Sequence, residues 1–305
     1  MSLFSSPTGR DPLYQLLQTA RNRVGSLTSD RLMKARDFAE ALYGRAAEYL
    51  DSDFQHRAGR EFHSRYWEMY VVCALLELGL PVVPRCDRKR GDRGPDVLVA
   101  PSTWIEATAV TAGTGADAVP EATPGRVRSV PDEGIKLRLL SALEDKRVKF
   151  EGYRASGVVG LTDPCVVAIN AGLVPSADIE RRVSRILRAL LEIGDEAAVM
   201  DRSTGEITNI VHLPQAVVAK RSGSQVSQGM FLDGSCGCIS ACLYSAVDPL
   251  NSSPLGLGGL GGGFVLLHNP TAKVSLPRGT IKRGHEYWVC DDGRVEQVHH
   301  EHPAA

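Results

Sequence analysis

The alternation of apolar and polar positions divides the chain into a helical beginning, a mixed middle and a strand-rich end. Apolar residues recur at helical spacing in three early segments: 11–24, 29–50 and about 57–79. Gly79 follows the last of these and is a typical helix terminator. Short β-branched runs bounded by proline and glycine then predict three strands: 80–84, 95–101 and 104–110.

The pattern changes again after the third predicted strand. A connection rich in glycine, proline and alanine leads into four further predictions: a helix over 135–150, a buried strand over 164–172, a helix over 176–194, and mostly short strands from 197 onward. We therefore expect an α/β fold whose mixed central sheet is flanked by helices. Its expected parts are an N-terminal helical extension (1–56), an α/β core (57–195) and a β-rich C-terminal part packed on that core (196–305).

The composition narrows the class of protein. The chain has 305 residues, of which 43% are hydrophobic and 23% charged, the balance of a soluble globular protein. It contains no apolar run of the roughly 20 residues that a membrane span needs and no secretory-signal pattern at its start, so we expect a cytoplasmic protein that binds no membrane. The net charge of −1 argues against general nucleic-acid binding through an overall positive surface, but it allows a local basic patch.

Two carboxylates fall on neighbouring predicted strands. Asp96 enters the second strand and Glu106 lies inside the third, where an unpaired buried charge is costly. Adjacent strands can bring the two side chains together, and a hard divalent cation such as Mg²⁺ or Mn²⁺ would relieve their repulsion. The carbonyl of Ala107 can supply a further oxygen. Such a cation polarises a phosphate oxygen and generates hydroxide from bound water.

Glu68 is the central charge of the apolar helix that precedes these strands. It shares a helical face with Val71, Val72 and Leu75, so it is expected to point toward the core. It can join the two strand carboxylates, or it can pair with Arg65 one turn earlier. Taken singly, Asp96 can also be a turn residue and Glu106 an outward-facing residue of an edge strand.

The residues Pro95-Asp96 and Glu106-Ala107-Thr108 resemble the motif of the PD-(D/E)xK, or restriction-endonuclease-like, nucleases. The order helix, three strands, helix, strand over residues 57–172 is similar to that family as well. The resemblance implies a restriction-endonuclease-like core and metal-dependent hydrolysis of phosphodiester bonds in nucleic acid, with DNA as the expected substrate. It also implies that Glu68 supports the metal through water, beside the ligands Asp96, Glu106 and Ala107.

The sequence departs from the family motif at Thr108, which stands where the motif has a lysine. A threonine supplies no positive charge to the attacked phosphate. Lys146 lies within the apolar stripe of the next predicted helix and can replace the missing lysine as a catalytic group. The competing interpretation is a lysine that extends along the helix to solvent.

Basic residues next to the proposed metal site are candidates for binding the nucleic-acid backbone. They occur in the segment before Pro95 and in the long connection: Arg85, Arg88, Lys89, Arg90, Arg93, Arg126 and Arg128. Contacts of this kind position a duplex without reading its sequence. The alternative is an ordinary solvated turn.

Two other functions remain open from the sequence. One is an inactive module that keeps the nuclease fold and binds nucleic acid or protein, and the other is a scaffold or partner-binding protein that uses the C-terminal half. Loss of Mg²⁺ affinity would favour the first, and absence of nucleic-acid binding even at low salt would favour the second. The oligomeric state, including a possible homodimer, is also open.

Overall fold

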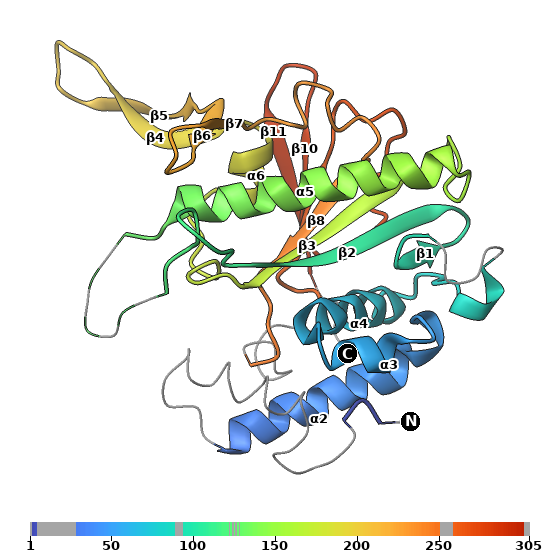
Figure 1. Cartoon of the computed structure of the whole chain (residues 1–305). Helices are drawn as coiled ribbons and strands as arrows, with labels where there is room; N and C mark the ends of the chain where they lie inside the picture. Colours follow the sequence, from blue (N-terminus) through green and yellow to red (C-terminus); the bar gives the residue numbers. More distant parts are fainter. Residues whose placement is uncertain are drawn as a thin grey trace.

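The computed structural model describes residues 2–4, 29–88, 94–250 apart from 122, 124, 126 and 128, and 259–301. Within them a seven-stranded mixed sheet forms the centre, in the order β1-β2-β3-β8-β9-β10-β11 (Figure 1). Its strands are β1 (Val97–Val99), β2 (Thr103–Thr111), β3 (Cys165–Leu173), β8 (Ala241–Ser245), β9 (Val265–His268), β10 (Gly284–Val289) and β11 (Val295–His300). The expected mixed α/β fold is therefore confirmed.

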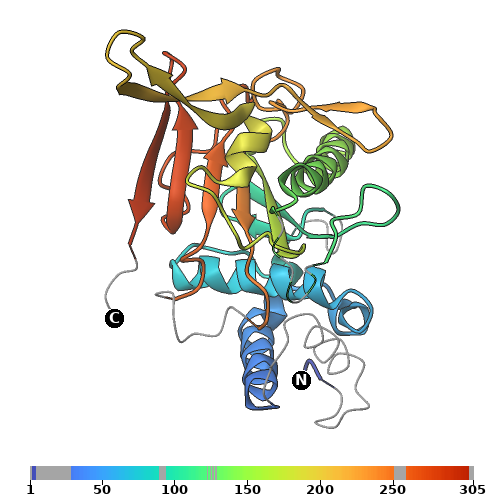
Figure 2. The ribbon, with the colours of Figure 1, turned by 90° about the vertical axis from the view of Figure 1, so that its left-hand side faces the viewer.

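Helices cover both faces of this sheet (Figures 1 and 2). One layer holds α2 (Ser29–Ala46), α3 (Phe54–Ala58) and α4 (Phe62–Glu77), and the other holds α5 (Asp132–Ala155) and α6 (Arg185–Leu190). Along β3, Val166 and Ala168 pack into the core on the α4 side, while Val167 and Ile169 pack into the core on the α5 side. Burial on both faces explains why β3 is a continuous apolar run.

The helix predicted over 57–79 is two helices separated by residues 59–61. Its predicted end is confirmed at Gly79, whose φ of +70° suits glycine in the left-handed region. The N–H of Leu80 donates to the carbonyl of Leu75 at 3.0 Å and closes the helix end. The chain then turns directly toward the sheet.

The β1–β2 hairpin and the α5 crossover arrange the first half of the sheet. β1 and β2 are antiparallel, with Val97 opposite Ile105, and α5 then returns the chain so that β3 lies parallel to β2. The strand predicted over 80–84 is reduced to a single bridge between Val82 and Val99. β3 and β8 are also parallel, and of the strands predicted from 197 onward the last four, β8 to β11, belong to the same sheet as the core.

The helix predicted over 176–194 was wrong for its first half, because only Arg185–Leu190 is helical. The fully buried guanidinium of Arg185 donates to the carbonyls of Ala177 at 3.2 Å and Ile179 at 2.9 Å. Those carbonyls would otherwise accept helical N–H groups. Ser176, with a φ of +64°, also departs from helical backbone.

Four short strands lie outside the central sheet. β4 (Ile193–Met200) and β5 (Ile207–Pro214) form a hairpin that projects from the body, and β6 (Val217–Ala219) pairs with β7 (Gln225–Ser227) (Figure 1). Among the helices of the described part of the chain, none is both long and apolar enough to span a bilayer.

Candidate functional site

Glu106 is the centre of a polar cluster between β2 and α5. Its side chain is almost fully buried, with 1% of the residue exposed. The Nζ atoms of Lys146 and Lys149 lie 2.8 and 2.9 Å from its Oε1, and the hydroxyl of Tyr153 lies 3.5 Å from its Oε2. These three residues follow one another at i, i+3 and i+7, so they share the face of α5 that lies over β2.

Asp96 lies immediately before β1 and faces the same stretch of β2. Its Oδ2 accepts a hydrogen bond of 2.7 Å from the N–H of Ala107. Burial and, after it, the nearby Glu106 carboxylate raise the pKa of Asp96 to about 6, against the opposing effect of Lys146. The two predicted carboxylates therefore do come together at this edge of the sheet.

The backbone of Ala107 is also directed toward Asp96. A strand residue directs its N–H and C=O to the same side, and the next-but-one residue, Ile105, pairs with β1 through Val97. The N–H of Trp104, the residue before Ile105, bonds to Pro164 on the other side, as this alternation requires. The Ala107 carbonyl therefore points toward Asp96, where the pairing of β1 with β2 has ended.

Glu68 approaches the same site from α4. Its side chain is buried, and its Oε2 accepts a hydrogen bond of 2.6 Å from Nη1 of Arg65. Burial and the Asp96 carboxylate raise the pKa of Glu68 well above its ordinary value, although Arg65 opposes the shift. The pairing with Arg65 is therefore present, and Glu68 lies near enough to Asp96 to interact with it electrostatically, while its support of a metal stays a prediction.

Lys146 points inward as the helical spacing predicts. Its side chain is 12% exposed, whereas that of Lys149 is 54% exposed. Lys149 and Tyr153 were not predicted, although their spacing from Lys146 is the signal that could have found them. Burial and then Glu106 raise the pKa of Tyr153 to about 12, so its phenol remains a hydrogen-bond donor at neutral pH.

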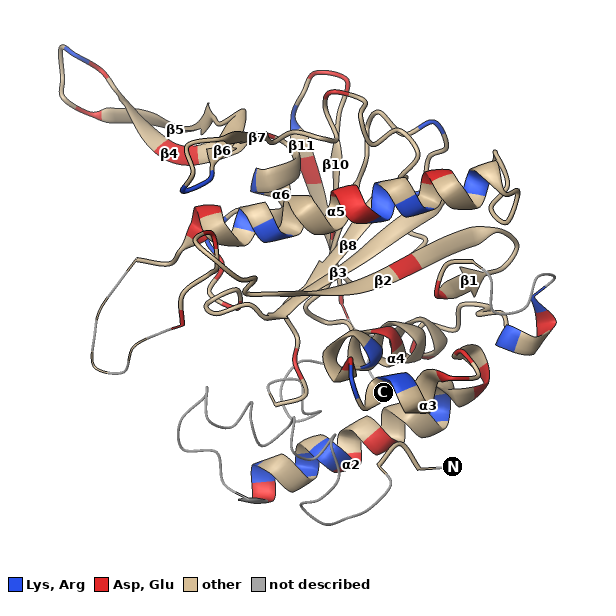
Figure 3. Cartoon of the chain, in the orientation of Figure 1, with Lys and Arg blue, Asp and Glu red and all other residues tan. Residues whose placement is uncertain are grey.

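A cleft of about 320 Å³ adjoins this cluster, between the second half of β2 and α5. Thr108 of β2 and the cations Arg138, Lys146 and Lys149 of α5 line it, with Asp145 as the opposing charge. Figure 3 shows the acidic band of β2 beneath the basic bands of α5. The excess of positive charge suits an anionic ligand.

The oxygen atoms of this site fit a hard divalent cation in part. Among the described residues, no three His, Cys, Asp or Glu side chains are already gathered as a metal cluster. Asp96 and the Ala107 carbonyl supply suitable oxygen donors on one side of β2. Glu106 shares one oxygen between two ammonium groups, and the more exposed Lys149 is the one that a cation would displace.

Arg85 and Arg88 were predicted to bind the nucleic-acid backbone, with a solvated turn as the alternative, and the structure places both side chains in the interior. Both are 7% exposed, and each donates an Nη1 hydrogen bond to the carbonyl of Pro95, at 3.1 and 3.2 Å. Arg85 also forms an ion pair with Asp51. These two side chains fix the backbone ahead of Asp96 and do not reach out to a ligand.

Five further residues were predicted to bind nucleic acid and lie outside the described part of the chain: Lys89, Arg90, Arg93, Arg126 and Arg128. Comparison with protein-family models, with curated proteins and with solved structures finds no match to this chain.

Proposed function

We propose that this chain is a metal-dependent phosphodiesterase that cleaves nucleic acid, with DNA as substrate and a restriction-endonuclease-like core. The observation that carries the proposal is the buried Glu106, which lies beside Asp96 and is held by a lysine of the following helix. The order α4, β1–β2 hairpin, α5 and parallel β3 supports the same reading.

In this proposal the carboxylates and one carbonyl hold Mg²⁺ or Mn²⁺. Asp96, Glu106 and the Ala107 carbonyl are the ligands, and Glu68 supports them through water. The bound cation would polarise a phosphate oxygen and activate water. Arg65 keeps Glu68 in place through its hydrogen bond of 2.6 Å.

Lys146 supplies the positive charge that the motif lysine would supply and that Thr108 lacks. Thr108 is two residues beyond Glu106, so both side chains lie on the face of β2 that α5 covers. The Lys146 ammonium reaches that face from the helix and stays 2.8 Å from Glu106. There it can balance the negative charge that develops on the attacked phosphate.

A second candidate is an inactive module that binds nucleic acid through the same cleft. One observation favours it: two ammonium groups already compensate the charge of Glu106. A site whose charge is already balanced by lysines attracts a metal cation less strongly.

Cleavage of supercoiled plasmid and of single-stranded DNA in Mg²⁺ or Mn²⁺ tests the proposal, with a chelator as control. Replacing Glu106 by Gln or Lys146 by Met should lower the rate by about 100-fold or more. Lys149→Met is the matched control, because it removes an ammonium from the same oxygen at an exposed position. Full activity in Lys146→Met would exclude that lysine, and an inactive wild type that still binds DNA would favour the second candidate.

A further inference from the structure

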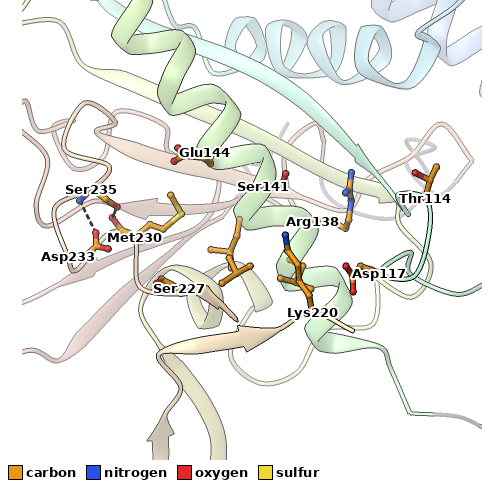
Figure 4. Close-up of a pocket in the computed structure, with 13 residues that line it drawn as sticks. Thr114, Asp117, Arg138, Ser141, Glu144, Lys220, Ser227, Met230, Asp233 and Ser235 are labelled. Atoms are coloured by element: carbon orange, nitrogen blue, oxygen red, sulfur yellow. Dashed lines mark hydrogen bonds between the residues drawn. The ribbon is translucent and has the colours of Figure 1, made fainter. Parts of the chain in front are cut away.

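A second pocket, of about 590 Å³, lies against α5 beside the cleft (Figure 4). The β6–β7 hairpin and residues 226–235 form its other walls. Its apolar surface comes from Leu137 and Leu140 of α5 together with Val226 and Met230. The volume falls within the range of about 300–1,000 Å³ typical of small-molecule sites.

The polar groups of this pocket are unevenly placed. Figure 4 shows Arg138, Asp117 and Lys220 at one end, and Met230, Asp233 and Glu144 at the other. Asp233 accepts the N–H of Ser235 at 2.8 Å, and Glu144 is bound by Arg147. Among the lining residues the cations therefore lie at one end, and the far end has two carboxylates, those of Asp233 and of the Arg147-bound Glu144, next to an apolar surface.

The pocket and the cleft meet on the surface of α5. Arg138 and Ser141 line both of them. Ser141 is small and exposed, so a chain can cross the helix at this point. Nε of Arg138 donates to the Thr111 carbonyl at 3.0 Å, which holds the guanidinium stem at the crossing.

We propose that this pocket binds an unstacked nucleobase of the strand whose phosphate lies in the cleft beside Lys146. The inference rests on the proposed function, since it takes the ligand of the cleft to be a nucleic-acid strand. Arg138 and Lys220 would flank the sugar-phosphate where it crosses α5, while Glu144 and Asp233 at the far end disfavour a phosphate inside the pocket.

The interior of the pocket suits a nucleobase. The thioether of Met230 and the side chain of Leu140 offer polarizable and apolar contacts to the faces of a ring. Carboxylate and serine oxygens at the rim can accept hydrogen bonds from the exocyclic amino groups of bases. The pocket therefore favours a single strand or a base withdrawn from a duplex over an intact helix.

The test compares a five-nucleotide single strand with its abasic counterpart, which has the same phosphates. Binding to the full chain is measured by fluorescence anisotropy in chelator, so that cleavage plays no part. The wild type should prefer the strand with bases by about 5-fold, the lower end of the range for one base stacked on an aromatic side chain, because Met230 and Leu140 offer apolar contacts and no aromatic ring. Met230→Ala, which changes only the pocket, should reduce this preference and leave affinity for the abasic strand unchanged. Ser141→Trp, which blocks the crossing, should also reduce the preference, and it should weaken binding of both strands because Ser141 lines the cleft as well.

Val148→Trp is the matched control, because Val148 is exposed on α5 and lines neither pocket nor cleft. It should keep the preference of the wild type. Equal affinity for the two strands, or a preference that survives both Ser141→Trp and Met230→Ala, would overturn the inference and leave the nuclease proposal standing. A preference without any cleavage would support the pocket and contradict the nuclease, and binding of neither strand would overturn both.

Discussion

Lys146 and Lys149 lie equally close to one oxygen of Glu106, yet their removal should have unequal effects on stability. The side chain of Lys146 is 12% exposed and that of Lys149 is 54% exposed. Breaking a buried ion pair costs about 3–5 kcal/mol of unfolding free energy, whereas an exposed pair contributes about 0–1 kcal/mol. With Lys149 still present as a partner, we expect Lys146→Met to cost about 2–4 kcal/mol and Lys149→Met less than about 1 kcal/mol.

Methionine is the chosen replacement because it keeps most of the unbranched stem and removes the ammonium group, with its charge and its hydrogen bond to Glu106. Urea unfolding at pH 7, monitored by circular dichroism and tryptophan fluorescence, gives the free energy of unfolding of each variant and its dependence on denaturant concentration. The double variant leaves the buried carboxylate without an ammonium, so its loss should exceed the sum of the single losses by about 0.5–3 kcal/mol.

A Glu106→Gln background supplies the control for this reasoning. Without the carboxylate, both lysine substitutions should become nearly neutral. Equal losses of unfolding free energy for Lys146→Met and Lys149→Met, or strict additivity in the double variant, would contradict this reasoning. Either result would show that burial does not decide how much each lysine contributes to stability.

Three further changes have expected outcomes. Burial alone would raise the pKa of Glu286, but hydrogen bonds from His300 and His268 hold it below its ordinary 4.5. The stability that results should be present above pH 4.5 and lost as the pH falls through the lowered pKa. Glu286→Gln should therefore flatten the urea midpoints measured between pH 3 and 7. Arg185→Met should cost about 3–5 kcal/mol in urea unfolding, with no rescue by lysine, because the buried guanidinium has several separate acceptors. Arg88→Met should lower the unfolding midpoint but leave the salt dependence of DNA binding unchanged, since that side chain is buried against backbone carbonyls; a smaller salt slope would place Arg88 on the nucleic acid instead.

Spacing along the chain was sufficient to predict which groups converge on the site. Strand order places Asp96 beside Glu106, and helical periodicity turns Glu68 and Lys146 inward. Each of these inferences depends on residues within one element or on two adjacent elements. Lys149 lies one turn beyond Lys146 and could have been found by extending the same helical face.

The features that sequence reasoning missed depend on distant partners. A run of charges looks alike whether it is solvated or buried, and only the carbonyl of Pro95 and the carboxylate of Asp51 make Arg85 a core residue. The helix predicted over 176–194 forms only over Arg185–Leu190, again because of a partner that is distant in the sequence. Arg185 pairs with Asp132, which is 53 residues away, and its side chain holds the preceding segment in a loop.

The short length of β1 explains why the carboxylates can meet at all. β1 has three residues, so Asp96 comes before its start, and β2 continues past it with no strand on that side of Ala107. The unpaired N–H of Ala107 is then taken by the Asp96 side chain, and the carbonyl of the same residue stays directed to that side. A longer β1 would satisfy both groups with backbone and cover the site. The truncated strand therefore supplies the position of Asp96 and leaves the β1 side of Ala107 to the Asp96 side chain.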